Sequence, residues 1–283
     1  MKKFIKPFLL VIFYFLSMMV SLFLILTLLF FFDYDSFVFA SGDDDVGQNY
    51  VEMLSPYIGV AIIINTLLTI AIAYLMKMVD FRHSFDCKSI DWKNIWIPFA
   101  GSVCFIFVVF VSVHILQFSS YRSDAMFRML ENVYGAIALI FLSRVLEELI
   151  FRDIIIRYMF SKGATPLQAL ICSVLCYALV AIGDPWDVPI YFCHGILFGI
   201  LFIKTGSVVL TTIIRISIYL FQYVVSREFD LLNINTDMPT SYYVVLFFVF
   251  TPPAIFLLWK FWKTPLPDGR HLPFDDAKIE AVE

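Results

Sequence analysis

The 283 residues are 61% hydrophobic and only 16% charged, and their mean hydropathy is +0.86. Soluble domains usually contain about half apolar and about a quarter charged residues, so this composition is typical of a chain that lies mostly in lipid. With a net charge of −4 and a pI of 5.6, the chain does not have the excess of basic residues that is typical of a nucleic-acid-binding protein. We therefore expect membrane lipids as partners and no nucleic acid.

A helix needs about 20 residues to cross a bilayer, and roughly eight apolar segments are near or above this length. They lie at 7–32, 53–76, 94–121, 132–158, 165–182, 188–203, 208–226 and 241–259. The sixth segment is short, so it could be tilted or re-entrant. The expected fold is all-α: a polytopic bundle of about eight transmembrane helices in one membrane-embedded domain, residues 1–283.

The first apolar segment follows Lys2, Lys3 and Lys6, as the core of a secretory signal would. Its uncharged run is much longer than the about 7 to 15 residues of a signal core, so we expect a retained membrane anchor. Farther along the chain, Thr165 and Pro166 resemble an N-cap and a first helical residue. They predict where the fifth helix begins.

Basic residues alternate between the predicted loops, and short cytoplasmic loops carry the excess of Lys and Arg. Residues 33–52 contain acidic residues and no Lys or Arg, whereas residues 77–93 contain several basic residues. When this alternation is continued in both directions, both termini are predicted to be cytoplasmic. Residues 260–283 are predicted to form a short cytoplasmic tail.

Four charged residues lie close together in the fourth segment: Arg144, Glu147, Glu148 and Arg152. On helical spacing, Arg144 and Arg152 lie one turn on either side of Glu148. Charges at membrane depth cost about 2.5 to 3.5 kcal/mol each on insertion scales, and they often mark a functional site. A carboxylate held there could activate a water as a general base; alternatively, the four charges could form a neutral network that holds helices together.

The pair Glu147-Glu148, followed by three residues and Arg152, resembles the EExxxR motif of the CPBP family. This family of CAAX proteases and bacteriocin-processing proteins includes the type II CAAX prenyl endopeptidases. Gly206-Ser207 and the glycine-bearing stretch 192–199 extend the resemblance to a CPBP-like core at 132–226. The resemblance implies an intramembrane endopeptidase in which a motif glutamate and a histidine activate water, with or without a divalent metal such as zinc.

The histidine motifs of that family are not matched in this sequence. Ala181 stands where the FxxxH histidine would be, Arg215 where the second histidine would be, and Tyr219 where its asparagine partner would be. Alanine can neither bind a metal nor move a proton, and arginine offers no lone pair. His194 could replace a catalytic histidine under another alignment, in which 190–194 becomes the FxxxH motif.

These substitutions lead to the functional prediction. A catalytic zinc needs about three protein ligands, so no metal or other cofactor is expected. We expect Arg215 to pair with Glu147 or Glu148 and to lower its basicity. The main prediction is a degenerate family member with a binding, immunity or scaffold role. One alternative is an active endopeptidase acting on a membrane protein or peptide, with either glutamate as base and His194 assisting; a small transporter is the second.

Overall fold

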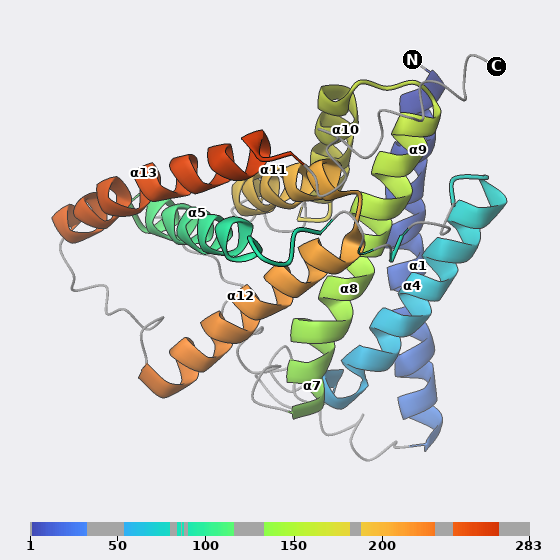
Figure 1. Ribbon diagram of the computed structural model, residues 1–283. Helices are drawn as coiled ribbons and strands as arrows, with labels where there is room; N and C mark the ends of the chain where they lie inside the picture. Colours follow the sequence, from blue (N-terminus) through green and yellow to red (C-terminus); the bar gives the residue numbers. More distant parts are fainter. Residues whose placement is uncertain are drawn as a thin grey trace. The chain divides into compact units, whose positions relative to one another are not determined.

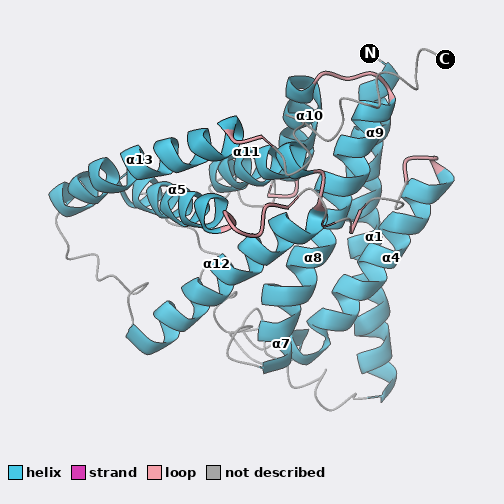
Figure 2. Cartoon of the chain, viewed as in Figure 1, coloured by secondary structure: helices cyan, strands magenta, loops and turns pink. Residues whose placement is uncertain are grey.

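The computed structural model describes residues 2–32, 54–79, 84–85, 87, 90–115, 133–181, 188–229 and 240–265. Within these ranges all regular structure is helical (Figure 1), and Figure 2 draws cyan helices and pink loops there but no magenta strand. The chain divides into two compact units. The first unit comprises Met1–Val79 and Tyr121–Ile150, and the second comprises Asp80–Ser120 and Phe151–Glu283. The all-α prediction is confirmed.

In the first unit, helix α1 (Lys2–Phe32) packs against helix α4 (Ile58–Leu75), which follows the short 3-10 helix η1 (Ser55–Tyr57). Polar side chains line part of this contact. The Ser17 hydroxyl donates to the Asn65 side-chain oxygen and lies 3.0 Å from the Thr69 hydroxyl. All three residues are buried, and small polar residues of this kind let two helices approach closely in lipid. The pairing of α1 with α4 fits a retained anchor.

The predicted fourth segment is a run of helical turns with no break between them. Its elements are α7 (Val133–Ile137), η2 (Ala138–Leu142), α8 (Ser143–Glu148), η3 (Leu149–Ile154) and α9 (Ile155–Ser161). The two η elements are π-helical, so two wide turns flank α8. Because π turns within helices occur frequently at functional sites, this segment is a candidate site on backbone geometry as well as on charge.

The second unit also contains five long helices. They are α5 (Trp96–Ile115), α10 (Pro166–Leu179), α11 (Val188–Thr205), α12 (Val208–Phe229) and α13 (Thr240–Lys263). Helix α5 lies beside α13, while α10 packs against α9 and α11. The core that joins α11 to α12 includes Phe198, Leu201 and Ile214. This packing fixes the positions of the residues on α10, α11 and α12 that are discussed below.

The contact between α10 and α11 depends on two glycines. A Cβ atom on Gly195 would meet the Val174 backbone at 3.3 Å, and one on Gly199 would meet the Leu170 side chain at 2.4 Å. Small residues at such a crossing let the two backbones approach closely. At the start of α10, Thr165 accepts a hydrogen bond from the Gln168 backbone N–H at 3.3 Å, which confirms the predicted N-cap.

Four described helices are long and apolar enough to cross a membrane: Lys3–Phe31, Ile58–Leu75, Val188–Thr205 and Thr240–Lys263. Shorter apolar helices lie at Trp96–Ser112, Pro166–Leu179 and Val208–Phe221. The chain is thus a membrane protein, and the predicted short sixth segment is one of its full-length candidates. The count of eight spans, the single domain and the cytoplasmic termini stay predictions.

Several of the regions used for the topology prediction lie outside the described residues. These are 33–53, 116–132, 182–187, 230–239 and 266–283, together with most of 80–89. Helix α13 continues to Lys263, so it extends into the segment predicted as a tail. The rest of that predicted tail, from residue 266 onward, is among the regions not described.

Candidate functional site

On α8 of the first unit, Glu147 is held by its own helix. The Ser143 hydroxyl donates to Glu147 Oε1 at 2.7 Å, and Arg144 Nη1 lies 3.1 and 3.2 Å from the two carboxylate oxygens. The Arg144 and Glu147 side chains are 6% and 13% exposed. An opposite charge this close favours the ionised carboxylate and makes it a weaker base. The two groups thus form a largely buried pair in which both charges are compensated.

Glu148 is the next residue on α8, and it is fully buried. Successive residues on a helix point about 100° apart, so two adjacent glutamates cannot share one environment. The ion pair with Arg144 is made by Glu147. Glu148 thus lies on another side of α8 than Glu147 and stays a candidate for a base.

In the second unit, two buried arginines contact the side chain of Tyr177 on α10. The Arg152 guanidinium lies 4.6 Å from the centroid of the Tyr177 ring, and the Arg215 guanidinium lies 5.1 Å from it. Arg215 Nη2 also donates a hydrogen bond to the Tyr177 hydroxyl. A tyrosine ring attracts cations through its face, and its oxygen accepts from a donor, so one side chain serves both arginines.

Two further aromatic rings lie beside Arg215. Its guanidinium lies 5.4 Å from the Phe198 centroid and 6.0 Å from the Tyr219 centroid. The His194 ring is buried and lies 6.3 and 6.4 Å from the same two rings. We call Arg152, Tyr177, His194, Phe198, Arg215 and Tyr219 the arginine–aromatic cluster. It brings together Arg152, His194, Arg215 and Tyr219, which the sequence had indicated separately.

A second polar network ties α9 to the turn between α11 and α12. The Asp153 carboxylate accepts from the Ser84 hydroxyl at 2.5 Å and from Arg157 Nε at 2.5 Å. Arg157 Nη2 donates to the Gly206 carbonyl at 2.5 Å, and Gly206 has a φ of +65°, which favours glycine. This network gives the Gly-Ser pair a structural role, and the sequence analysis did not identify it.

Residues 128–221 match the family model described as type II CAAX prenyl endopeptidase Rce1-like. This segment is similar to that family. The match contains α7 to α11 and most of α12, so both the glutamate pair and the arginine–aromatic cluster lie inside it. It confirms the recognition made from EExxxR. No curated protein and no solved structure matches the chain.

Within the CAAX-protease-like segment, Ala181 lies just beyond the end of α10 and is fully buried. Its side chain adds only a methyl group where the family motif has a histidine. Tyr177, four positions earlier, stands where that motif has a phenylalanine and supplies the hydroxyl that Arg215 uses. The feature of the sequence that could have indicated the contact between Tyr177 and Arg215 is tyrosine in place of phenylalanine at the first position of the motif.

No group of three or more His, Cys, Asp or Glu residues that could hold a metal ion occurs among the described residues of the chain. The arginine–aromatic cluster instead presents two guanidinium groups, which carry no free lone pair and repel a cation. This donor set does not fit a divalent metal, and the lack of a cofactor stays a prediction.

Proposed function

We propose that this CAAX-protease-like membrane protein binds a membrane protein or peptide without cleaving it. The supporting observation is Arg215, which stands at the second histidine position and is buried against Tyr177, Phe198 and Tyr219. A guanidinium stays protonated and cannot accept a proton from water. The group at this position therefore cannot serve as the catalytic histidine would.

The state of the glutamates supports the same proposal. Glu147 is compensated by Arg144 and Ser143, which weakens it as a base. Glu148 would then need a second group to orient the water and pass on its proton, as general base catalysis usually requires. The expected pairing of Arg215 with a glutamate would join residues of different units, and it stays a prediction.

One observation favours the alternative, an active endopeptidase. His194 lies near two of the rings that surround Arg215, and a neutral imidazole can accept a proton. Under this alternative, Glu148 would be the base and His194 its assistant. A bacteriocin-immunity role and transport stay predictions from the sequence.

The test is a cleavage and binding assay on the full chain in lipid nanodiscs. The substrates are a prenylated CAAX peptide and a fluorescent transmembrane peptide, and an active type II CAAX endopeptidase is the positive control. We expect the wild-type chain, Glu148→Gln and His194→Gln to release no product. Cleavage by the wild-type chain that either substitution abolishes would contradict the proposal and establish the alternative.

A companion experiment uses cells that lack the native gene. Wild type, Glu147→Ala and Glu148→Ala are expressed at matched levels, and the membrane fraction is checked for intact protein. If binding is the function, all three should restore the phenotype equally. Loss of the phenotype with Glu148→Ala, for a variant that is present and folded, would count against a role without hydrolysis.

A further inference from the structure

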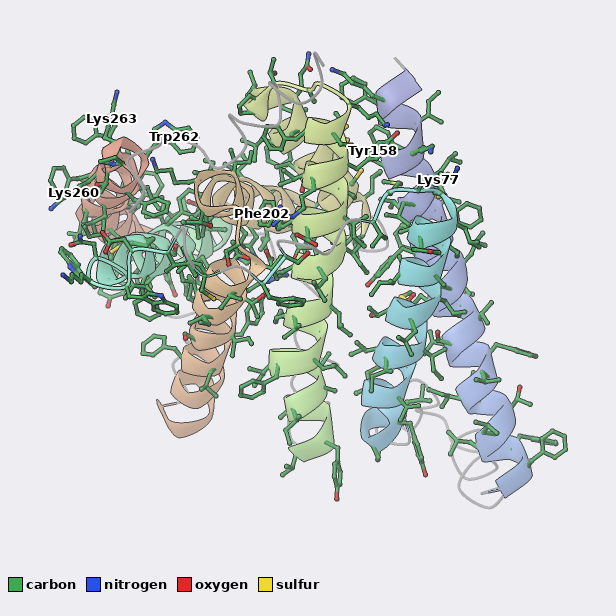
Figure 3. The ribbon with its side chains drawn as sticks, turned by 45° about the vertical axis from the view of Figure 1, so that its right-hand side comes forward. Lys77, Tyr158, Phe202, Lys260, Trp262 and Lys263 are labelled. Atoms are coloured by element: carbon green, nitrogen blue, oxygen red, sulfur yellow. The ribbon has the colours of Figure 1, made fainter. Side chains whose placement is uncertain are left out.

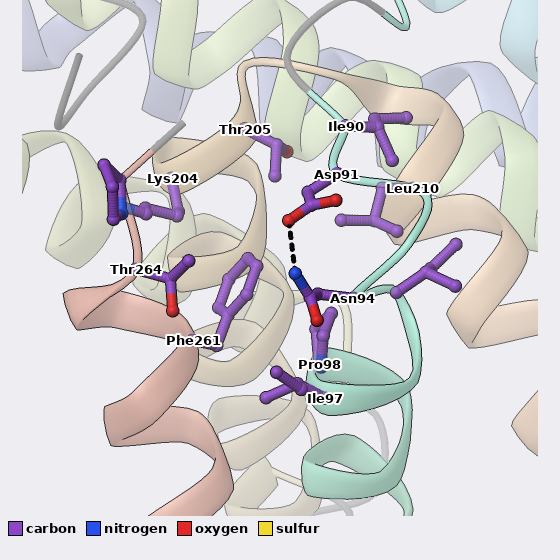
Figure 4. Close-up of a pocket in the computed structure, with 12 residues that line it drawn as sticks. Ile90, Asp91, Asn94, Ile97, Pro98, Lys204, Thr205, Leu210, Phe261 and Thr264 are labelled. Atoms are coloured by element: carbon purple, nitrogen blue, oxygen red, sulfur yellow. Dashed lines mark hydrogen bonds between the residues drawn. The ribbon is translucent and has the colours of Figure 1, made fainter. Parts of the chain in front are cut away.

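A cavity lies at one end of the second unit, where α5 begins and where α11 and α13 end (Figure 4). Its wall is partly apolar, with Ile97, Leu210 and Phe261, and partly polar. The polar side chains come from three separate parts of the chain. They are Asp91, Asn94, Lys204, Thr205 and Thr264.

Lys204 places a positive charge in this cavity. It lies in the last turn of α11, it is only 2% exposed, and its ammonium is 6.0 Å from the centroid of the Trp262 ring. A lysine ammonium has three donors and no acceptor. Its charge in the cavity wall would attract an anion that enters the cavity.

Asp91 is the carboxylate in the same cavity, and it accepts hydrogen bonds from two neighbouring groups. Its Oδ2 accepts from Asn94 Nδ2 at 2.7 Å (Figure 4), and its Oδ1 accepts from the Lys93 backbone N–H at 3.2 Å. Asp91 still opposes an entering anion through its charge. Removing the Asp91 charge must therefore strengthen anion binding, and this change in affinity can be measured.

The surface around the cavity has the composition of a membrane interface. Trp96, Trp259 and Trp262 are exposed, and Lys260 lies 5.7 Å from the Trp96 ring centroid. Lys260 and Lys263 project outward from the last turns of α13 (Figure 3). Tryptophans are enriched at the level of the lipid headgroups, and lysines there attract anionic lipids.

Helix α13 also offers a path for acyl chains. Only 6% of its most apolar stretch is buried inside the protein. Ile255 and Phe256, which precede the lysines on the same helix, are largely exposed. A lipid whose headgroup occupies the cavity could therefore lay its chains against α13.

From these observations we infer that this end of the second unit binds one anionic phospholipid. The lipid phosphate pairs with Lys204 and accepts from the Asn94 amide, Lys260 and Lys263 add attraction at the rim, and the acyl chains lie along α13. The site holds a lipid, and it is independent of the proposed function because none of its residues belongs to the glutamate pair or to the arginine–aromatic cluster.

The test is native mass spectrometry of the full chain in detergent, with phosphatidylglycerol and phosphatidylcholine titrated as competitors. Wild type should bind one phosphatidylglycerol in clear preference to phosphatidylcholine. Lys204→Met should weaken phosphatidylglycerol binding by about tenfold or more, as loss of a charge-assisted hydrogen bond implies, and Lys204→Arg should keep most of it. Asp91→Asn should strengthen binding.

The matched control is Lys162→Gln. Lys162 is an exposed lysine that also lies near an aromatic ring, 5.8 Å from the centroid of Tyr158, but it is not part of the cavity. This variant should bind phosphatidylglycerol like wild type. If it loses as much affinity as Lys204→Met, binding reflects general charge, and the site is overturned.

Two further results would overturn the inference. One is equal binding of the two lipids by wild type. The other is complete displacement of phosphatidylglycerol by inorganic phosphate, which would make free phosphate the ligand. If circular dichroism shows that Lys204→Met does not fold, Asp91→Asn decides: unchanged affinity there rejects an anion in the cavity.

Discussion

Glu147 in the first unit and Arg215 in the second are both charged groups with little or no exposure, but they are stabilised in different ways. Glu147 receives hydrogen bonds from Ser143 and Arg144, both within one turn of the same helix. Arg215 is surrounded by the rings of Tyr177, Phe198 and Tyr219, which come from other helices or from the next turn. The first arrangement is local and electrically neutral, whereas the second is assembled by tertiary packing.

The difference indicates what each group can contribute to chemistry. A carboxylate paired with its own helix is compensated wherever that helix lies, so weak basicity is part of the local structure. A guanidinium that contacts π faces and a phenol oxygen is held by side chains from several helices. It depends on the packing of α10, α11 and α12, so its loss should disturb much more of the molecule.

The largest expected effect is that of Arg215→Ala. It removes a charge-assisted hydrogen bond and three cation–π contacts, and it should lower the free energy of unfolding by about 3 to 5 kcal/mol. Denaturant unfolding in detergent, followed by circular dichroism, measures it. Arg215→Lys keeps the charge and should lose only about half as much. A loss below about 1 kcal/mol for Arg215→Ala would mean that the cluster is not a structural centre.

Next in size is Tyr177→Phe, which removes one oxygen and leaves the ring. It should cost about 2 kcal/mol, the range for a buried hydrogen bond to a charged group. Tyr242→Phe is the matched control, because Tyr242 is 45% exposed, and it should change the free energy of unfolding by less than about 0.5 kcal/mol. Equal effects of the two substitutions would show that Arg215 depends on π faces alone.

The local pair should give a smaller value. A double-mutant cycle with Arg144→Met and Glu147→Gln should yield a coupling energy of about 1 kcal/mol. Both single variants and the double variant are unfolded under the same conditions. A coupling energy near zero would show that the Glu147 carboxylate is not compensated by Arg144, and Glu147 would again be a candidate base.

The smallest expected effect is that of a metal chelator. Excess 1,10-phenanthroline or EDTA should leave the unfolding temperature and peptide binding unchanged, because the guanidinium groups of the cluster cannot hold a divalent ion. Metal added back after chelation is the control. A lower unfolding temperature that zinc restores would contradict the prediction that the protein holds no metal.

Much of the fold could be predicted because it depends on local signals. Long apolar runs predicted the helices, and Thr165 with Pro166 predicted the start of α10. The two π turns could not be predicted, since no residue type marks them. No pattern in the sequence indicated that residues from η3 and α12 would meet at Tyr177 of α10.

The candidate site could also be predicted only where it depends on local signals. Helical spacing placed Arg144 three residues before Glu147, and the structure forms that pair. His194, Arg215 and Tyr219 were recognised only as departures from a family pattern. Their common contact with aromatic rings is a tertiary property, and it depends on how closely Gly195 and Gly199 let α11 approach α10.

The π turn at Ala138–Leu142 has a consequence for the rotational phase of its helix. A π turn closes its hydrogen bond over five residues rather than four, so it accommodates one residue more than an α turn. In α7, Gly135 and Ala136 are buried, and Tyr134 and Ile137 are exposed. Deleting one residue from the wide turn would let it close as an α turn, and α7 and α8 would keep their rotational phase. The wide turn therefore absorbs one residue while Tyr134 stays exposed and Gly135 and Ala136 stay buried.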